Sequence, residues 1–198
     1  SSLQLDLRKH NAQYPEIKSL DNSDPLFRQL TGGVKTFYRA VATSSDIPHP
    51  VFYRYSLKGD EDIYFVAART NIGIPAIASI NGLAYPEELH NKKEIILPSF
   101  PGIYVAKAST NDLQRMMQAI RSEYLTEDNK IEVHINAWKT YFFFPDDKFT
   151  SLELAFFLNI LFRFPLVEGY LSSKYGARVH PISGQEDFHS GIDIAAPK

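Results

Sequence analysis

The sequence predicts an α+β protein, and three patterns of apolar residues carry this prediction. Residues 53–58 alternate apolar with polar side chains, which is typical of a half-buried strand. Between residues 113 and 124, apolar side chains recur at helical spacing. A second alternating run at 131–135, followed by an aromatic run up to Phe144, indicates a pair of strands. Strands and helices therefore follow one another along the chain.

Composition limits the size of the core and the classes of partner. The 198 residues, 44% of them hydrophobic, suffice for one ordinary core or two small ones. The 21 basic and 23 acidic residues nearly cancel and form no block, which argues against nucleic acid or a lipid surface as main partner. Since there is no cysteine, disulfides and thiolate zinc sites are excluded.

The N-terminal 50 residues predict an arm and a lead-in. Residues 1–25 are polar and aperiodic, so we expect an extended arm. Within 26–50, the aromatic and aliphatic pattern at 34–41 predicts a strand. The chain begins Ser1-Ser2 without a signal peptide, so any export is inferred from function.

Residues 51–99 predict a strand, two helices and a second strand. Gly59-Asp60 follows the first strand, either Asp60 or Asp62 is expected to cap the first helix, and Asn81-Gly82 forms a turn after the second. The positions that complete the pattern are Tyr53, Tyr55, Leu57, Ile63, Val66, Ala67, Ile77, Ile80, Leu83 and the closing run Glu94-Ile95-Ile96-Leu97-Pro98. This order resembles the LysM domain, a small peptidoglycan-binding module.

The LysM resemblance implies a shallow groove for a chain of N-acetylglucosamine. The groove would lie between the start of the first helix and the loop after the second. Its residues would be Asp60, Glu61, Asp62, Ile63, Ile80, Asn81, Gly82 and Leu83. Glu61-Asp62 stands where the family usually has threonine, so the alternative is a LysM-like spacer that packs against its neighbour.

Residues 100–165 predict a further mixed α/β segment. We expect a strand at 103–106 and then a helix capped by Ser109 or Thr110. The apolar stripe of this helix, expected in the core, consists of Leu113, Met116, Met117, Ile120 and Tyr124. The strand pair and a turn at 145–147 follow. Thr150 to Glu153 form a capping box that opens a buried helix up to Phe162, whose apolar run is too short for the roughly 20 residues of a membrane span.

The last residues contain two side chains of the kind that bind zinc. His189 and Asp193 are four residues apart, so an extended strand would present both on one face, opposite Ile192 and Ile194. Zinc accepts imidazole nitrogen and carboxylate oxygen, and a catalytic site uses three protein ligands and a water. His189 and Asp193 are therefore candidate zinc ligands, one fewer than a catalytic site needs.

The flanking residues resemble the opening of the lysostaphin-type (LytM-like) zinc endopeptidases, which cut peptide cross-links in bacterial cell walls. The motif is Ser172-Ser173-Lys174-Tyr175-Gly176-Ala177-Arg178-Val179-His180-Pro181, followed by His189-Ser190-Gly191-Ile192-Asp193 and Ala195-Ala196-Pro197. The resemblance implies that His189 and Asp193 are the first two zinc ligands. The third ligand and the catalytic histidine belong to a later His-x-His pair, which residues 166–198 do not reach. Arg178 and His180 are candidate accessory residues.

These resemblances together predict a zinc metalloendopeptidase of the cell envelope, periplasmic or extracellular, with a glycan-binding module at 51–99. By itself the chain is expected to hold little or no zinc and to be inactive. A longer reading frame or a second fragment would supply the remaining ligands. The alternatives are a non-catalytic peptidoglycan-binding or regulatory protein, and a scaffold at 26–165 that docks an envelope protein.

Overall fold

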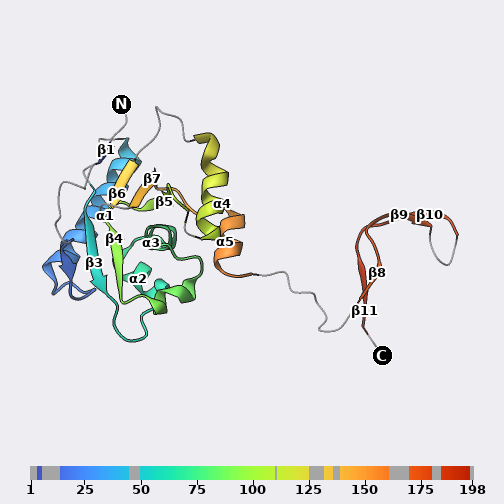
Figure 1. The fold of residues 1–198 in the computed structure, drawn as a ribbon, viewed down its shortest axis with the longest axis horizontal. Coiled ribbons are helices and arrows are strands. Elements are labelled where there is room, and N and C mark those ends of the chain that lie inside the picture. Colours follow the sequence, from blue (N-terminus) through green and yellow to red (C-terminus); the bar gives the residue numbers. More distant parts are fainter. Residues whose placement is uncertain are drawn as a thin grey trace. The chain divides into compact units, whose positions relative to one another are not determined.

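The computed structural model divides the chain into two compact units, Ser1–Ile160 and Leu161–Lys198. The residues that the structure describes are 4–5, 14–44, 50–109, 111–124, 132–135, 139–160, 170–179 and 184–196. The first unit mixes helices with two sheets, which confirms the α+β class (Figure 1). The second is a ribbon of short strands, and each unit is described by itself.

The first sheet and its two helices form a strand, helix, helix, strand unit, as the pattern of residues 51–99 predicts. Its elements are β3 (Phe52–Ser56), α2 (Ile63–Thr70), α3 (Ile74–Asn81), the 3-10 helix η2 (Pro86–Asn91) and β4 (Glu94–Pro98). Strands β3 and β4 are antiparallel, with Phe52 opposite Pro98 and Ser56 opposite Glu94. Asp62, not Asp60, caps α2, and Gly82 ends α3 in the left-handed conformation.

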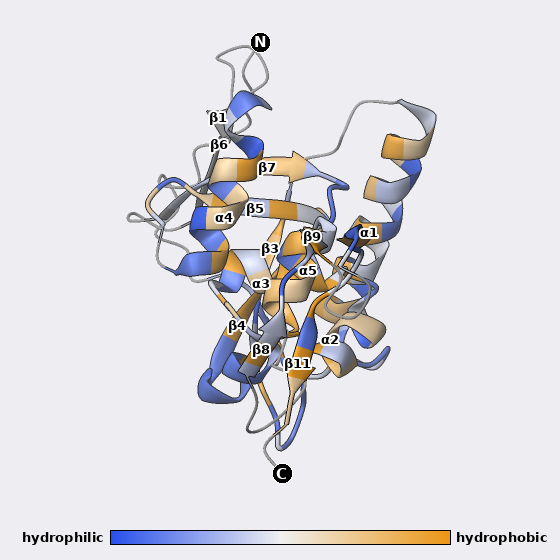
Figure 2. Cartoon of the chain, turned by 90° about the vertical axis from the view of Figure 1, so that its right-hand side faces the viewer, coloured by the Kyte–Doolittle hydropathy of each residue, from blue (hydrophilic) through white to orange (hydrophobic). Residues whose placement is uncertain are grey.

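The segment before this unit is a helix, so the predicted strand at 34–41 is wrong. Helix α1 (Pro25–Thr43) begins where Asp24 accepts hydrogen bonds from the backbone N–H groups of Leu26 and Phe27. Its buried face consists of Phe27, Leu30, Val34, Phe37 and Ala40. Hydrophilic and hydrophobic residues alternate along it in Figure 2. Gly32 and Gly33 have low helix propensity and obscure the pattern in the sequence, but burial of a face with helical spacing outweighs that propensity.

The predicted N-terminal arm, residues 1–25, contributes two short strands to the sheets. β2 (Glu16–Ile17) pairs in parallel with β3, and β1 (Gln4–Leu5) pairs in parallel with β6 (Glu132–Ile135). The second sheet has the order β1-β6-β7-β5. In it, β7 (Lys139–Pro145) lies antiparallel to both β6 and β5 (Gly102–Ala106), which confirms the predicted strand pair and the strand at 103–106.

Helix α4 (Asp112–Arg121) covers part of the predicted stripe with its buried residues Leu113 and Met117. Asn111 caps it by accepting from the N–H of Gln114 at 2.8 Å, so the predicted caps Ser109 and Thr110 are wrong. Asparagine serves as an N-cap as readily as serine or threonine, so the sequence alone does not decide which of residues 109–111 caps the helix. Tyr124, in the following 3-10 helix η3 (Ser122–Tyr124), is 67% exposed and does not extend the core stripe.

Helix α5 (Ser151–Phe157) begins with the predicted Thr150 capping box but is shorter and less buried than predicted. Glu153 and Phe157 are buried, whereas Leu152 and Leu154 are exposed. The rest of the predicted helix beyond residue 160 lies outside the described residues. Glu153 contacts Arg121 of α4, and this buried ion pair fixes α5 to α4.

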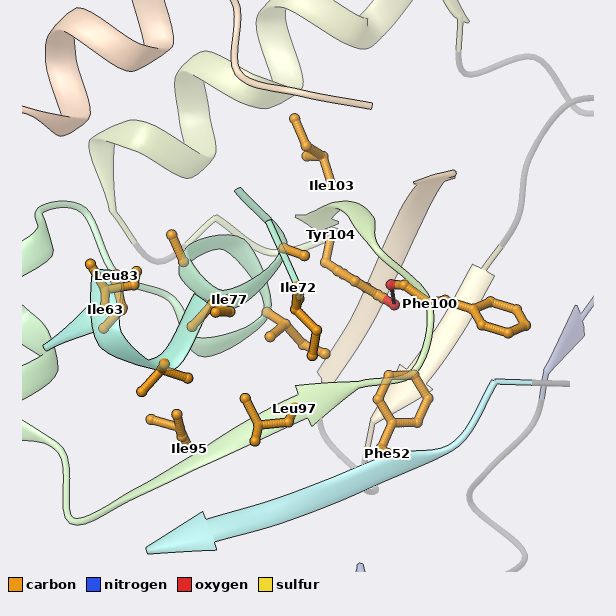
Figure 3. Close-up of a cluster of buried hydrophobic side chains, with 14 of the residues drawn as sticks. Phe52, Ile63, Ile72, Ile77, Leu83, Ile95, Leu97, Phe100, Ile103 and Tyr104 are labelled. Atoms are coloured by element: carbon orange, nitrogen blue, oxygen red, sulfur yellow. Dashed lines mark hydrogen bonds between the residues drawn. The ribbon is translucent and has the colours of Figure 1, made fainter. Parts of the chain in front are cut away.

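One hydrophobic cluster joins both sheets of the first unit. Figure 3 shows Phe52 and Leu97 of the first sheet together with Ile103 and Tyr104 of the second. The Tyr104 hydroxyl donates to the carbonyl of Phe100 at 2.7 Å, so its buried polar atom is satisfied.

Within the described ranges, no single helix has the length and apolarity of a membrane span. Helices α2 and α3 meet both criteria only when taken together, as a pair bent by 119°.

The second unit is built from two short antiparallel strand pairs. β8 (Tyr170–Ser173) pairs with β11 (Asp193–Ala195), and β9 (Gly176–Val179) pairs with β10 (Glu186–His189). None of its described residues is buried.

Candidate metal site and glycan groove

His189 and Asp193 lie on two successive strands and not on one. His189 ends β10 opposite Gly176, and Asp193 begins β11 opposite Ser173. The chain bends between them, and the pairing slips between Asp193 and Ile194. The prediction of one continuous strand is therefore wrong, because Ser190-Gly191 turns the chain. The bend nevertheless brings the two side chains together.

The imidazole of His189 is held in an orientation that suits a metal ligand. Its Nδ1 lies 3.0 Å from the carbonyl oxygen of Lys174 and 3.4 Å from the hydroxyl of Ser173. A carbonyl oxygen can only accept, so this contact favours a proton on Nδ1, and in the neutral form of that tautomer Nε2 has a lone pair. Metal-binding histidines almost always donate their other ring N–H to such an acceptor, which fixes the tautomer.

The distance between the two candidate ligand atoms fits a zinc ion. His189 Nε2 lies 3.4 Å from Asp193 Oδ1. Two ligands at about 2.0–2.1 Å from a tetrahedral zinc are about 3.3 Å apart, so the separation of these two atoms is compatible with binding to one ion. Asp193 is also fixed through its backbone, because its carbonyl accepts from the Ser172 hydroxyl at 3.1 Å.

The remaining predicted residues of this site do not complete it. Across the described ranges, no group of three or more His, Cys, Asp or Glu side chains could hold a metal ion. Arg178 pairs through its backbone with Asp187 in the β9–β10 ladder, while its side chain and all of His180 lie outside the described residues. The arrangement is thus a pair of candidate ligands.

In the predicted glycan groove, two of the three acidic side chains in the loop before α2 accept hydrogen bonds from the chain itself. Asp62 accepts from the N–H of Phe65 at 2.7 Å, and Glu61 accepts from the Tyr55 hydroxyl and the Lys58 N–H, both at 2.9 Å. The pKa of Tyr55 is raised, mainly because the hydroxyl is buried and secondly because it donates to the carboxylate of Glu61. Asp60 is exposed, and Ile63 is buried.

The loop after α3 is engaged by the chain itself. Ile80 and Leu83 are buried, and their side chains are not available to a ligand. The Tyr141 hydroxyl donates to the Ile80 carbonyl at 3.1 Å, and the Asn111 side chain donates to the Gly82 carbonyl at 3.0 Å. Tyr141 of β7 and Asn111, the cap of α4, therefore already donate to two backbone carbonyls on this side of the predicted groove.

Gln114 strengthens this attachment, and the sequence did not single it out. It is buried, accepts from the N–H of Ala106 at 2.8 Å and donates to the carbonyl of Ser79 at 2.9 Å. No local pattern marks Gln114 as buried, because it lies off the predicted apolar stripe and its partners Ala106 and Ser79 are distant in sequence or belong to other elements. Gln114 links the second sheet to the end of α3.

Comparison with known proteins does not assign the chain to a group. It matches no protein-family model, no curated protein and no solved structure. The class that the structure defines is a mixed α+β protein, and its C-terminal ribbon brings Nε2 of His189 within 3.4 Å of Oδ1 of Asp193.

Proposed function

We propose that this protein is a zinc-dependent endopeptidase of the bacterial cell envelope that hydrolyses peptide cross-links of peptidoglycan. The observation that carries the proposal is the 3.4 Å separation of His189 Nε2 and Asp193 Oδ1, with Nδ1 turned to the Lys174 carbonyl. The lysostaphin-type motif around these residues supports the same assignment.

The roles of the chain's own residues follow from that geometry. His189 would bind zinc through Nε2 and Asp193 through Oδ1, while the Lys174 carbonyl holds the imidazole in the required tautomer. When bound, zinc polarises a carbonyl and lowers the pKa of a water. The third ligand and the catalytic histidine would come from a His-x-His pair in a longer frame or second fragment. Because the proposed substrate is cell-wall peptidoglycan, the whole protein would act in the periplasm or outside the cell.

The test is to express the longest reading frame that contains this chain and to measure zinc content and muropeptide hydrolysis. His189→Ala and Asp193→Ala should abolish both together, whereas His90→Ala, at an exposed position of η2, should change neither. His180→Ala should lower turnover at most and leave zinc in place. Retention of zinc and activity in both ligand variants would refute the proposal.

A second candidate, a non-catalytic peptidoglycan-binding or regulatory protein, is favoured by the exposed Asp60 beside the LysM-like α2. The engaged loop at 80–83 favours the spacer interpretation instead, because Tyr141 and Asn111 occupy its carbonyls. Residues 52–98 share one core with the second sheet, so their deletion would disrupt the fold. A point variant is the sharper test.

The sedimentation of the chain with purified sacculi separates these interpretations. If the Asp60 side of the groove binds N-acetylglucosamine chains, Asp60→Arg should reduce sedimentation, while Asp112→Arg, at an exposed position of α4, should not. If neither variant nor the unmodified chain sediments above background, the module is a spacer. The outcome is independent of the zinc test.

A further inference from the structure

A pocket of about 560 Å³ lies where the end of α4 faces the end of β7. Its lining includes Ile120, Tyr124, Phe143, Phe144 and Pro145. Its volume falls within the roughly 300–1,000 Å³ of small-molecule sites, which are mostly apolar with a few polar groups. It shares no residue with the histidine–aspartate pair or with the predicted glycan groove.

The walls of this pocket present aromatic rings to a ligand. Tyr124 is two-thirds exposed, so its ring is accessible, whereas Phe143 is buried. Aromatic faces attract cations because the ring quadrupole is negative there. Phe144 shows this preference within the protein, since the guanidinium carbon of Arg121 lies 5.7 Å from its ring centroid.

Arg121 borders the pocket but has no hydrogen-bond donor left for an anionic ligand. Its Nε donates to Asp147 at 2.8 Å, and its terminal nitrogens contact both oxygens of Glu153. Those nitrogens also reach the carbonyls of Met117 at 3.5 Å and Lys148 at 3.3 Å. A guanidinium has five N–H groups, and these five contacts use all of them.

Arg121 and Asp147, the two charged residues in the lining of the pocket, form an ion pair. Arg121 also pairs with Glu153, which is fully buried and lies outside the lining, so the three linked charges sum to minus one. Each oxygen of Asp147 accepts one hydrogen bond, from Arg121 Nε and from the Lys148 N–H, both at 2.8 Å. A carboxylate has about four acceptor sites, so Asp147 can accept further donors, and its side chain is 40% exposed.

We propose that this pocket binds a primary ammonium group carried on an aliphatic chain. The ammonium would be held by Asp147 and the aromatic faces, and the aliphatic chain would pack against Tyr124 and Ile120. Such a group occurs at the end of a lysine-like side chain of a peptide and in a free diamine. The site does not depend on zinc or on the proposed peptidase activity.

The test is an NMR titration of the 15N-labelled chain with three probes. Nα-acetyl-lysine amide represents the peptide source, cadaverine represents the free amine, and Nα-acetyl-norleucine amide is the neutral control. One or both ammonium probes should shift the amides of residues 120–124 and 143–150 saturably, and the better binder identifies the source. Norleucine binding that equals both ammonium probes, or shifts confined to other residues, would overturn the proposal.

Variants of two exposed tyrosines provide the matched comparison. Tyr124→Ala should weaken ammonium binding about two- to five-fold, and Tyr124→Phe should retain it because the ring face remains. Tyr64→Ala, at an exposed position of α2, should leave the affinity unchanged. Asp147→Asn should also weaken binding, with the urea midpoint recorded to confirm folding. Unchanged affinity in both Tyr124→Ala and Asp147→Asn would overturn the assignment.

Discussion

The side-chain amide of Asn81 pairs with the backbone of Ile96 in both directions. Asn81 Oδ1 accepts from the Ile96 N–H at 2.7 Å, and Nδ2 donates to the Ile96 carbonyl at 2.9 Å. Nδ2 also donates to the Ile77 carbonyl at 2.8 Å. Asn81 thus satisfies backbone groups along one side of β4 and attaches the end of α3 to the sheet.

Asn81→Ala should therefore destabilise the first unit. It would leave the N–H and carbonyl of Ile96 without these partners in a half-buried strand, at a cost of about 1–3 kcal/mol. Urea unfolding measures the change. Asn91→Ala, at an exposed position of η2, should stay within about 0.5 kcal/mol. Equal small effects at both positions would show that the Asn81 contacts do not stabilise the fold.

Arg121→Met should be far more damaging than Arg115→Met on the same helix. Arg121 pairs with the fully buried Glu153, and removing one partner of a buried pair costs about 3–5 kcal/mol. Arg115 pairs with Asp112 at the surface, where such a pair contributes about 0–1 kcal/mol. The free energy of unfolding of both variants checks this. Similar losses in the two would contradict the account of how α5 is fixed.

Asp24 should make stability fall in acid. Burial raises the pKa of Asp24, but hydrogen bonds from the backbone N–H groups of Lys18, Phe27, Leu26 and Ser19 outweigh it and hold the pKa below 3.8. Hydrogen bonds from Ser19 and Ser23 likewise lower the pKa of Asp21 to about 2. A depressed folded-state pKa stabilises the fold above the unfolded value, and that stabilisation is lost as pH falls from about 4 towards 2.

Urea unfolding at a series of pH values from 5 to about 2 measures this dependence. Asp24→Asn should flatten the slope because the group no longer titrates, while Asp60→Asn, in the exposed loop before α2, should leave the slope as it is. An unchanged slope in Asp24→Asn would show that other carboxylates control the acid sensitivity.

The elements that sequence periodicity predicted are those with local signals. The alternation at 53–58 and the capping box at Thr150 each specify a structure within a few residues, and both are found. The sequence predicts a strand at 34–41 instead of helix α1, because Gly32-Gly33 interrupts the pattern of a buried face that spans the whole helix. Its partners in the core lie far along the chain, so their packing was not visible in local spacing.

The candidate sites show the same division. The motif identified His189 and Asp193, but the bend at Ser190-Gly191 that joins them depends on strand pairing with β8 and β9. The use of the Gly82 carbonyl by Asn111 is a contact across 29 residues. The pocket beside Tyr124 likewise needs β7 to reach α4. Long-range contacts of this kind leave no periodic trace in the sequence.

The most direct test of the central claim is a zinc titration of the 198-residue chain, followed through the imidazole resonances of its histidines by NMR. We expect weak binding that shifts the resonances of His189 first, because two ligands do not complete a zinc site. Asp193→Ala should weaken this binding, His189→Ala should abolish it, and His90→Ala should leave it unchanged. Muropeptide hydrolysis should be undetectable. Zinc that binds tightly at one equivalent without shifting His189 would contradict the assignment of His189 and Asp193 as a zinc-binding pair.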